Sequence, residues 1–247
     1  MRPEGLLLPG ERLDDLEIQG LRLIQNPACF CYGTDAVLLA DFAKAREGER
    51  VADLCTGSGV IPLLMWAKTK ARAFFALELQ EQMADMAARS VAYNQLEDRI
   101  QVVQGDVRDA AGLLGKSSMQ VVTVNPPYMK AAGGLTNPNP LLAMARHEIT
   151  TDLDTILLSA SELLCPGGRL YMVHRPHRLS EIFAGCKKAA LEPKGMRFVH
   201  PRRDQKPVLV LIEALKGGNP WLNVAPPLIL YREAGIYTDE VLKIYGR

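Results

Sequence analysis

C-x-x-C pairs and long apolar runs are both missing from this 247-residue chain. Its five cysteines form no C-x-x-C pair and no cluster of Cys and His completes a zinc-type site, so we expect free thiols and no metal. The longest apolar run in the middle of the chain, VIPLLMWA, is far too short to span a bilayer of about 30 Å. The N-terminal MRPEGLLLPGERLDD turns acidic after three leucines and lacks a signal-peptide core. We therefore expect a cytoplasmic protein without membrane spans.

Repeats and low-complexity segments are also absent, and the composition is that of an ordinary globular protein. Apolar residues make up 48% of the chain and charged residues 23%, which are usual shares for a soluble domain. A chain of this length can bury a full core. We therefore expect one large domain with short additions.

The net charge of +1 is unevenly distributed along the chain. Residues 169–206 hold ten Lys or Arg and three Asp or Glu, a surplus of +7, and the remaining 19 basic and 25 acidic residues leave −6. A basic segment in a nearly neutral protein favours contact with a polyanion. Charges scattered over several solvated faces are the alternative, and charge alone leaves both open.

From residue 50 onward, predicted strands and helices alternate. Short apolar or β-branched runs predict strands, and apolar residues at i, i+3, i+4 and i+8 predict helices. The predicted strands are 50–54, 73–79, 100–104, 119–124, the end of 165–174, 195–200 and 207–214, and the predicted helices are 60–69, 81–95, 152–164 and 178–192. This alternation indicates an α/β fold with a doubly wound, mostly parallel, seven-stranded sheet covered on both faces.

The segments around this core predict a few further elements. Residues 16–27 predict a small hairpin around Gly20, and residues 33–45 predict a helix with Thr34 as its N-cap. The short connection between the last two strands indicates a hairpin, and hence an antiparallel strand at one edge of the sheet. Residues 216–247 are rich in Pro and Gly, which favours an extended arm.

A glycine-rich turn, DLCTGSGV, follows the first strand of the core. It carries Asp53, Gly57 and Gly59, and its glycines allow a ligand to approach the backbone closely at a helix N-terminus. The turn matches neither G-x-G-x-x-G nor G-x-x-x-x-G-K-[ST], so neither a dinucleotide nor a triphosphate is favoured.

Polar residues also follow the next three strands. Glu78 ends the second strand, about twenty residues after the turn begins, where an acid can bind a ribose diol. Asp106 follows the third strand, and Asn125 opens the segment NPPY after the fourth. In open α/β sheets, ligands bind outside the carboxyl ends of the strands. Four such features at successive strand ends therefore predict a ligand site at this edge.

The segments DLCTGSG, LEL, GD and NPPY together resemble the S-adenosylmethionine-dependent methyltransferase fold, in the branch that methylates exocyclic or amide nitrogens. Over residues 15–240, YGTDAVLLADF, ARHE and LIEALKGG make the chain similar to the bacterial tRNA1(Val) adenine-N6-methyltransferase family, which acts on the purine beside the anticodon. The resemblance implies a single Rossmann-like methyltransferase domain over residues 1–247. It would comprise a hairpin extension (1–32), a catalytic core (33–215) and a C-terminal arm (216–247).

The resemblance also implies a site for S-adenosylmethionine. Glu78 would hold the ribose hydroxyls of the cofactor, and Asp106 would hold its adenine amino group. The other predicted cofactor-binding residues are Thr34 and Asp35, by the methionine end, together with Asp53, Thr56, Gly57, Gly59 and Asn125. Cys55 stands where many relatives have the first glycine of the turn, so we expect an ordinary φ at that position.

The tetrapeptide Asn125-Pro126-Pro127-Tyr128 is predicted to be catalytic. The prolines lack backbone donors and fix φ, so the chain continues as neither a central strand nor a helix. The Asn125 side-chain oxygen and the Pro126 carbonyl would each accept one N–H of the acceptor amine, and Tyr128 would stack on the base. Because a methyl sulfonium is already a strong electrophile, positioning supplies most of the catalysis, up to about 7–11 kcal/mol.

Three other interpretations of this tetrapeptide remain open. It also occurs in glutamine N5-methyltransferases of release factors, although we see no long N-terminal helical region to hold a protein substrate. A non-catalytic RNA- or cofactor-binding protein that kept the fold is the second. The third is a rigid loop that ends a strand and places Tyr128 in the core.

The later loops supply candidate substrate contacts. Residues 129–146 contain glycines and prolines and are predicted to form a mobile lid. His147 and Glu148 are either substrate contacts or polar residues at a helix start.

The connection between the last two strands carries Arg202, Arg203 and Lys206, which we predict to bind RNA phosphates. An exposed basic hairpin tip is the alternative. We expect RNA, with tRNA foremost, as the partner of a monomeric enzyme.

Overall fold

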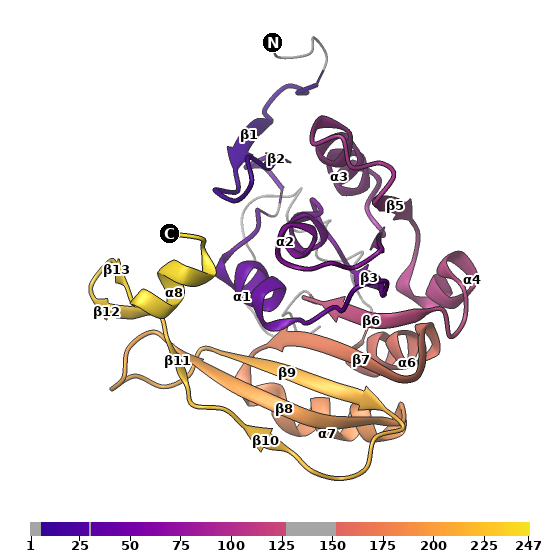
Figure 1. Ribbon diagram of the computed structural model, residues 1–247, viewed down its shortest axis with the longest axis vertical. Helices are drawn as coiled ribbons and strands as arrows, with labels where there is room; N and C mark the ends of the chain where they lie inside the picture. Colours follow the sequence, from indigo (N-terminus) through magenta and orange to yellow (C-terminus); the bar gives the residue numbers. More distant parts are fainter. Residues whose placement is uncertain (1–5, 30, 127–151) are drawn as a thin grey trace.

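The computed structural model of the chain describes residues 6–29, 31–126 and 152–247. Its centre is a nine-stranded sheet in the order β10-β8-β9-β7-β6-β3-β4-β5, with β11 also paired to β8 (Figure 1). The seven strands of the core are β3 (Arg50–Leu54), β4 (Ala73–Glu78), β5 (Ile100–Gln104), β6 (Met119–Val124), β7 (Leu164–His174), β8 (Leu191–His200) and β9 (Leu209–Lys216). The predicted α/β fold with a central, mostly parallel sheet is confirmed.

Strands β3 to β7 run parallel to their neighbours, and β9 runs antiparallel to both β7 and β8. The predicted hairpin of the last two long strands is therefore present, but its antiparallel strand, β9, lies between β7 and β8 and not at an edge of the sheet as predicted. Two short strands, β10 (Asn223–Val224) and β11 (Leu228–Ile229), add to the outer side of β8. Because two successive reversals restore the direction of β7, the carboxyl end of β8 lies at the same end of the sheet as those of β3 to β7.

Helices cover both faces of this sheet (Figure 1). They are α1 (Thr34–Phe42), α2 (Val60–Lys68), α3 (Glu81–Tyr93), α4 (Ala110–Leu114), α6 (Leu153–Leu163) and α7 (Leu179–Lys188), with 3-10 turns η1 (Val107–Asp109) and η2 (Pro176–Arg178). Side chains alternate across a strand, so Val51 and Val121 pack in the core beside α1 and α2, whereas Ala52 and Val122 pack in the core beside α6 and α7. The site residues of β3 and β6 sit within this two-sided frame.

An N-terminal hairpin is formed by β1 (Arg12–Asp15) and β2 (Arg22–Gln25), which pair antiparallel. Gly20 lies in its turn as predicted, but its first strand precedes the predicted range 16–27. Strand β2 is fastened to α3 by hydrogen bonds: Ile24 N–H donates to the Ser90 hydroxyl at 2.9 Å, and the Asn94 side chain bonds both main-chain groups of Arg22. The hairpin therefore packs against α3.

The C-terminal segment is more structured than an extended arm. After β11 it forms a hairpin of β12 (Tyr231–Glu233) and β13 (Ile236–Tyr237), then helix α8 (Asp239–Ile244). Val241 and Ile244 of α8 are buried, and the rings of Tyr231, Tyr237 and Tyr245 stack in series at centroid distances of 5.0 and 5.4 Å. The prolines of this segment end at residue 227, and only single glycines at turns follow them.

The start of α1 also differs from the prediction. Gly33, with φ −116° and ψ −176°, is the N-cap, and Thr34 is already helical. A Thr34 side chain inside the first turn cannot act as the cap, because an N-cap residue has non-helical backbone angles. The Asp35 carboxylate instead accepts the N–H of Ala36 at 2.9 Å, and the Thr34 hydroxyl accepts a hydrogen bond from Tyr245 at 3.4 Å.

The five cysteines are free, as predicted. Within the described ranges, no three His, Cys, Asp or Glu side chains gather as they would to hold a metal. None of the helices described is long and apolar enough to cross a membrane.

Candidate functional site

The turn after β3 brings the chain back into α2 through three left-handed residues. Cys55 has φ +57°, Gly57 has φ +60° and Gly59 has φ +85°. The expectation of an ordinary φ at Cys55 is therefore wrong. The path of the turn demands a positive φ whether or not the residue is glycine, and an L-residue held there costs about 1–2 kcal/mol.

Gly59, the N-cap of α2, lies against α3. A Cβ placed on Gly59 would approach the Cβ of Ala87 to 3.2 Å, so both the positive φ and the close packing favour glycine. The first turn of α2 is thereby seated against α3. The free N–H groups of this helix N-terminus open toward the carboxyl ends of the strands.

Asp53 occupies the last buried polar position of β3. Its side chain is 1% exposed, and one carboxylate oxygen accepts the Thr56 hydroxyl at 2.6 Å, the other the Thr123 hydroxyl at 2.6 Å. Burial raises the pKa of Asp53 to about 7; the two hydroxyl bonds lower it and the nearby Glu78 charge raises it further. Asp53 therefore holds the turn in place through its hydrogen bond from the Thr56 hydroxyl.

Glu78, at the end of β4, is also buried, with an exposed fraction of 6%. Its carboxylate accepts the N–H of Gly57 at 2.8 Å and the N–H of Gln80 at 3.0 Å. Burial raises the pKa of Glu78, and the backbone N–H bonds oppose that rise. A carboxylate offers about four acceptor positions, so Glu78 can still accept from a ribose hydroxyl.

Asp106 lies two residues beyond the end of β5 and close to Glu78, because Gly105 N–H donates to the Glu78 carbonyl at 2.8 Å. Its carboxylate accepts the main-chain N–H of Arg108 at 2.8 Å and pairs with the Arg108 guanidinium at 2.5 Å. The side-chain bond from Arg108 lowers the pKa of Asp106. Asp106 is thus a charged acceptor at the rim of the site, half-buried and able to accept from an amino group.

The end of β6 carries Asn125 and Pro126, of which Pro126 is buried. The ladder between β3 and β6 ends with the pair Leu54 and Val124. Asn125 therefore lies beside the turn between β3 and α2, residues 55–59, which we call the cofactor turn. The predicted Pro127 and Tyr128, the loop 129–146 and His147 and Glu148 lie outside the described residues.

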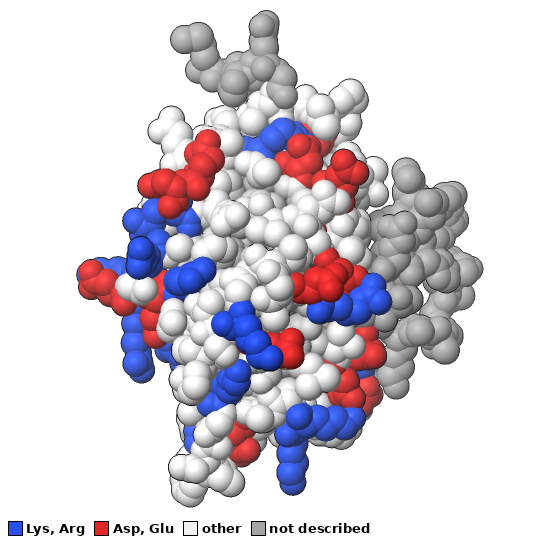
Figure 2. Space-filling model, turned by 90° about the vertical axis from the view of Figure 1, so that its right-hand side faces the viewer, with Lys and Arg blue, Asp and Glu red and all other residues white. Residues whose placement is uncertain are grey.

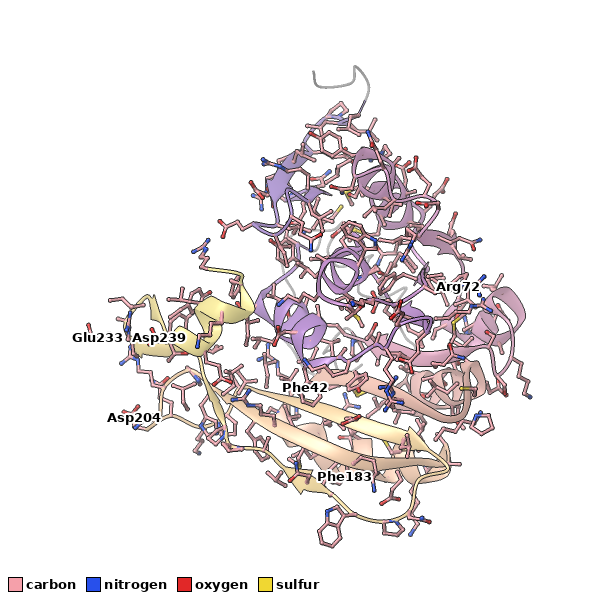
Figure 3. The ribbon with its side chains drawn as sticks, in the orientation of Figure 1. Phe42, Arg72, Phe183, Asp204, Glu233 and Asp239 are labelled. Atoms are coloured by element: carbon pink, nitrogen blue, oxygen red, sulfur yellow. The ribbon has the colours of Figure 1, made fainter. Side chains whose placement is uncertain are left out.

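Thr34 and Asp35 stand at the start of α1. This helix packs along α2, the helix that begins at the cofactor turn, and against β7. At its other end the Phe42 ring meets Tyr171 edge-on at 5.8 Å (Figure 3). The two predicted residues are therefore on a helix next to the turn, and Thr34 is bonded to Tyr245.

Direct hydrogen bonds thus join Asp53 to Thr56 and Glu78 to Gly57, and they also join Asp53 to one residue that the sequence did not point to. That residue is Thr123, fully buried in β6 and directly across from Asp53 in the strand register. Its signal was a hydroxyl within the apolar run VVTV, two residues before Asn125.

The predicted RNA-binding residues Arg202, Arg203 and Lys206 lie in the β8–β9 loop, residues 201–208, and are exposed. This loop follows the carboxyl end of β8 and hence lies at the same end of the sheet as the cofactor turn. The C-terminal arm braces it: Leu230 N–H donates to His200 and Tyr231 N–H to Pro201, at 2.8 and 2.9 Å. Figure 3 accordingly places Asp204 of the loop at the same side as Glu233 and Asp239.

The strand-end residues fit S-adenosylmethionine by the chemistry of their groups. Glu78 offers acceptors for a diol, Asp106 offers acceptors for an amino group, and the glycine turn allows close approach to the backbone. The fold and these strand ends define an S-adenosylmethionine-dependent methyltransferase of the doubly wound class.

Comparison with known proteins leads to the same class. The methyltransferase small domain family matches residues 20–193, which is more than half of the chain. The chain belongs to this family. Two curated relatives carry the name tRNA1(Val) (adenine(37)-N6)-methyltransferase. That of Porphyromonas gingivalis is 27% identical and the match covers 86% of each chain; that of Aeromonas salmonicida is 27% identical, with 86% of this chain and 87% of the relative covered.

A solved structure is similar as well. It is that of a predicted O-methyltransferase from Agrobacterium tumefaciens, with a TM-score of 0.70 and 26% identity, and the match covers 86% of this chain and 95% of that one. The predicted methyltransferase class and the family resemblance are confirmed.

Proposed function

We propose that this protein transfers the methyl group of S-adenosylmethionine to the exocyclic N6 of an adenine in tRNA, next to the anticodon. The relatives named above carry this activity in their names. The observation that carries the proposal is the meeting of β3, β4 and β6, where Asp53 and Glu78 hold the cofactor turn and Asn125 emerges beside it.

The chemistry asks for positioning more than for acid or base strength. The cofactor supplies a methyl group on a sulfonium, which a neutral amine can attack directly. An adenine amino group delocalises its lone pair into the ring, so the protein has to turn that lone pair toward the methyl group. Asn125, through its side-chain oxygen, and Pro126, through its carbonyl, are the acceptors that would hold the two amino hydrogens. Pro127 would stiffen this segment and Tyr128 would stack on the base.

The predicted cofactor set is kept as a proposal with one refinement. Glu78 and Asp106 would bind the ribose and the adenine amino group, and the turn with Gly57 would border the sugar. Asp53 would support the turn and not bind the cofactor directly, since both of its oxygens already accept hydroxyls. Thr34 and Asp35 would approach the methionine end from α1.

The β8–β9 loop is the proposed contact for the RNA phosphates. Most other cations of the basic segment already have partners: Arg178 pairs with Glu181, Lys188 with Asp154 and Arg197 with Glu240. By contrast, Arg202, Arg203 and Lys206 make no ion pair with any residue in the described ranges, which leaves them for an external anion. On the face presented in Figure 2, positive and negative side chains are interspersed.

A glutamine side chain of a protein is the second candidate acceptor, because its amide could occupy the same Asn125–Pro126 acceptors. The unpaired cations at the same end of the sheet favour RNA. A tRNA substrate would place the protein in the cytoplasm. The monomeric state and the division into residues 1–32, 33–215 and 216–247 of one domain remain proposals.

Incubation with cofactor carrying a labelled methyl group tests the function. Parallel reactions would contain bulk tRNA, a release factor, or neither, and the tRNA would be digested for nucleoside analysis. We expect label in N6-methyladenosine. Label in protein alone, or in neither substrate, would contradict the proposal.

A further inference from the structure

We propose that the Thr123 hydroxyl, bonded to the buried Asp53 carboxylate, sets the position of Asn125 relative to the cofactor turn, which makes Thr123 a positioning residue for methyl transfer. The inference rests on the proposed function and adds a residue to it.

The link consists of three buried side chains. Asp53 is 1% exposed, Thr56 4% and Thr123 0%. Each hydroxyl lies 2.6 Å from a different oxygen of the carboxylate, the length of a charge-assisted O–H···O bond. A carboxylate bonded in this way on both oxygens has one geometry in which both contacts are kept.

The link adds side-chain contacts to a backbone ladder that ends before both functional segments. Main-chain pairing between β3 and β6 ends at Leu54 and Val124, and the two functional segments begin just beyond. Thr56 is in the turn, two residues past Leu54, and its N–H is bonded to the Leu77 carbonyl at 3.0 Å. The carboxylate of Asp53 therefore joins the turn to β6 at Thr123, one register position before the last pair and two residues before Asn125.

Small displacements at this place are expected to be costly for the rate. A misplacement of about 1 Å in a reacting group can cost about a hundredfold in rate. The Thr123 hydroxyl holds β6 two residues before Asn125, and the same carboxylate holds the turn. Loss of the hydroxyl would leave β3 and β6 joined by their backbone ladder but would remove the side-chain link between the turn and β6.

The ionisation of Asp53 gives the link a measurable signature. A charged carboxylate accepts both hydroxyls, whereas a protonated one must donate its proton and so lose or reverse one bond. Burial raises its pKa to about 7, and the Thr123 bond lowers it. The titratable groups that face it are Glu78 of β4 and Cys55 of the turn; the described residues of β6 and the first two turns of α2 have none.

The test compares Thr123→Val, which keeps the shape and removes the hydroxyl, with Thr123→Ser, which keeps the hydroxyl. Thr69→Val is the matched control, because it removes a threonine hydroxyl bonded to a main-chain carbonyl at the end of α2. For T123V we expect kcat to fall about tenfold or more, while cofactor Kd changes less than about threefold. The acid limb of its kcat profile should move to higher pH, because the carboxylate has lost a bond that stabilises its charge. T123S and T69V should keep the profile of the original protein.

Two spectroscopic readouts in the protein without cofactor or RNA separate this inference from the proposed function. Carbon-13 NMR of the Asp53 carboxyl should show a higher titration midpoint in T123V, and the Asn125 side-chain amide signals should shift in T123V but stay in place in T69V. Unmoved Asn125 signals or an unchanged Asp53 midpoint in T123V would overturn the inference, whatever the tRNA assay gives. If T123V does not fold, Thr123→Cys, with a weaker donor, should move both signals in the same direction. A T123S variant that is as slow as T123V would also overturn it.

Discussion

The cofactor turn and the β8–β9 loop lie at the same end of the sheet but differ in the burial and pairing of their charged side chains. In the turn, Asp53 and Glu78 are buried and every oxygen is bonded to a hydroxyl or N–H of the chain itself. In the loop, Arg202, Arg203 and Lys206 are exposed and pair with no described acid. The first region is therefore organised before a ligand arrives, because a buried unpaired charge is costly. The second gains its charge partners only from outside.

The sharpest way to test this division is to remove Asn125, which stands between the two regions. Asn125→Ala should lower kcat about 10²–10³-fold, as the loss of one preorganised polar contact does in other enzymes. Cofactor Kd should stay within about threefold of the original, because the turn keeps its own bonds. Single-turnover kinetics and calorimetry measure the two quantities. Asn219→Ala, at an exposed amide, is the control; a large loss of cofactor affinity in N125A would contradict the assigned role.

Removal of Glu78 should affect the organised region alone. Glu78→Ala loses the acceptor of two N–H groups and the partner proposed for the ribose diol. A hydrogen bond to a charged group is worth about 1.5–3 kcal/mol, so cofactor affinity should fall about 10- to 100-fold. Isothermal calorimetry measures this fall, and circular dichroism checks the fold. Glu81→Gln, at the exposed start of α3, should bind the cofactor as the original protein does. Equal losses of affinity in both variants would show that the Glu78 carboxylate has no specific role in cofactor binding.

Neutralising the loop should affect the other region alone. Each of Arg202→Ala, Arg203→Ala and Lys206→Ala should weaken tRNA binding and reduce the slope of log K against log salt by about 1. Cofactor affinity should not change. Filter binding across a salt series measures the slope. Lys70→Ala, an exposed lysine in the turn before β4 at the opposite end of the sheet, is the control, and an equal effect there would mean that binding is unspecific.

The smallest expected effect concerns the strain at Cys55. Glycine adopts a positive φ freely, whereas alanine does not, so C55G should be more stable than C55A by about 1 kcal/mol. Urea denaturation measures the difference. Alanine serves as the reference because both variants lack the thiol. Equal stabilities would mean that the left-handed backbone at residue 55 is not strained.

Much of this fold could be predicted because its strands and helices carry their own periodicity. The bounds of β3, β5 and β6 match the prediction to the residue, since each is a short buried run between turn residues. The ligand site at the carboxyl ends of the strands could be predicted because alternating strands and helices imply a parallel sheet, whose carboxyl ends lie at one edge. Such regularity is local, and the sequence contains it.

The errors arose where a neighbour decides the conformation. Thr34 is a good N-cap by type, but the chain enters α1 one residue earlier, at Gly33. Cys55 takes a positive φ because the strand-to-helix path requires it, and residue preference did not reveal that. Helix α8 has only six residues, too few for a strong periodic signal, and it is held by burial against other elements. Thr123 belongs to no motif: its partner Asp53 is 70 positions away in sequence.

The close contact between Gly59 and Ala87 limits the size of the side chain at both positions. Helix α3 does not itself carry the cofactor turn, but its residue 87 must stay small. A larger side chain at residue 87 would displace the backbone of residue 59. Selection for methyl transfer would then restrict the side chain at a buried position of α3 that does not contact the substrate. An engineer who wishes to widen the cofactor site for a bulkier sulfonium could begin at that helix, and leave the turn untouched.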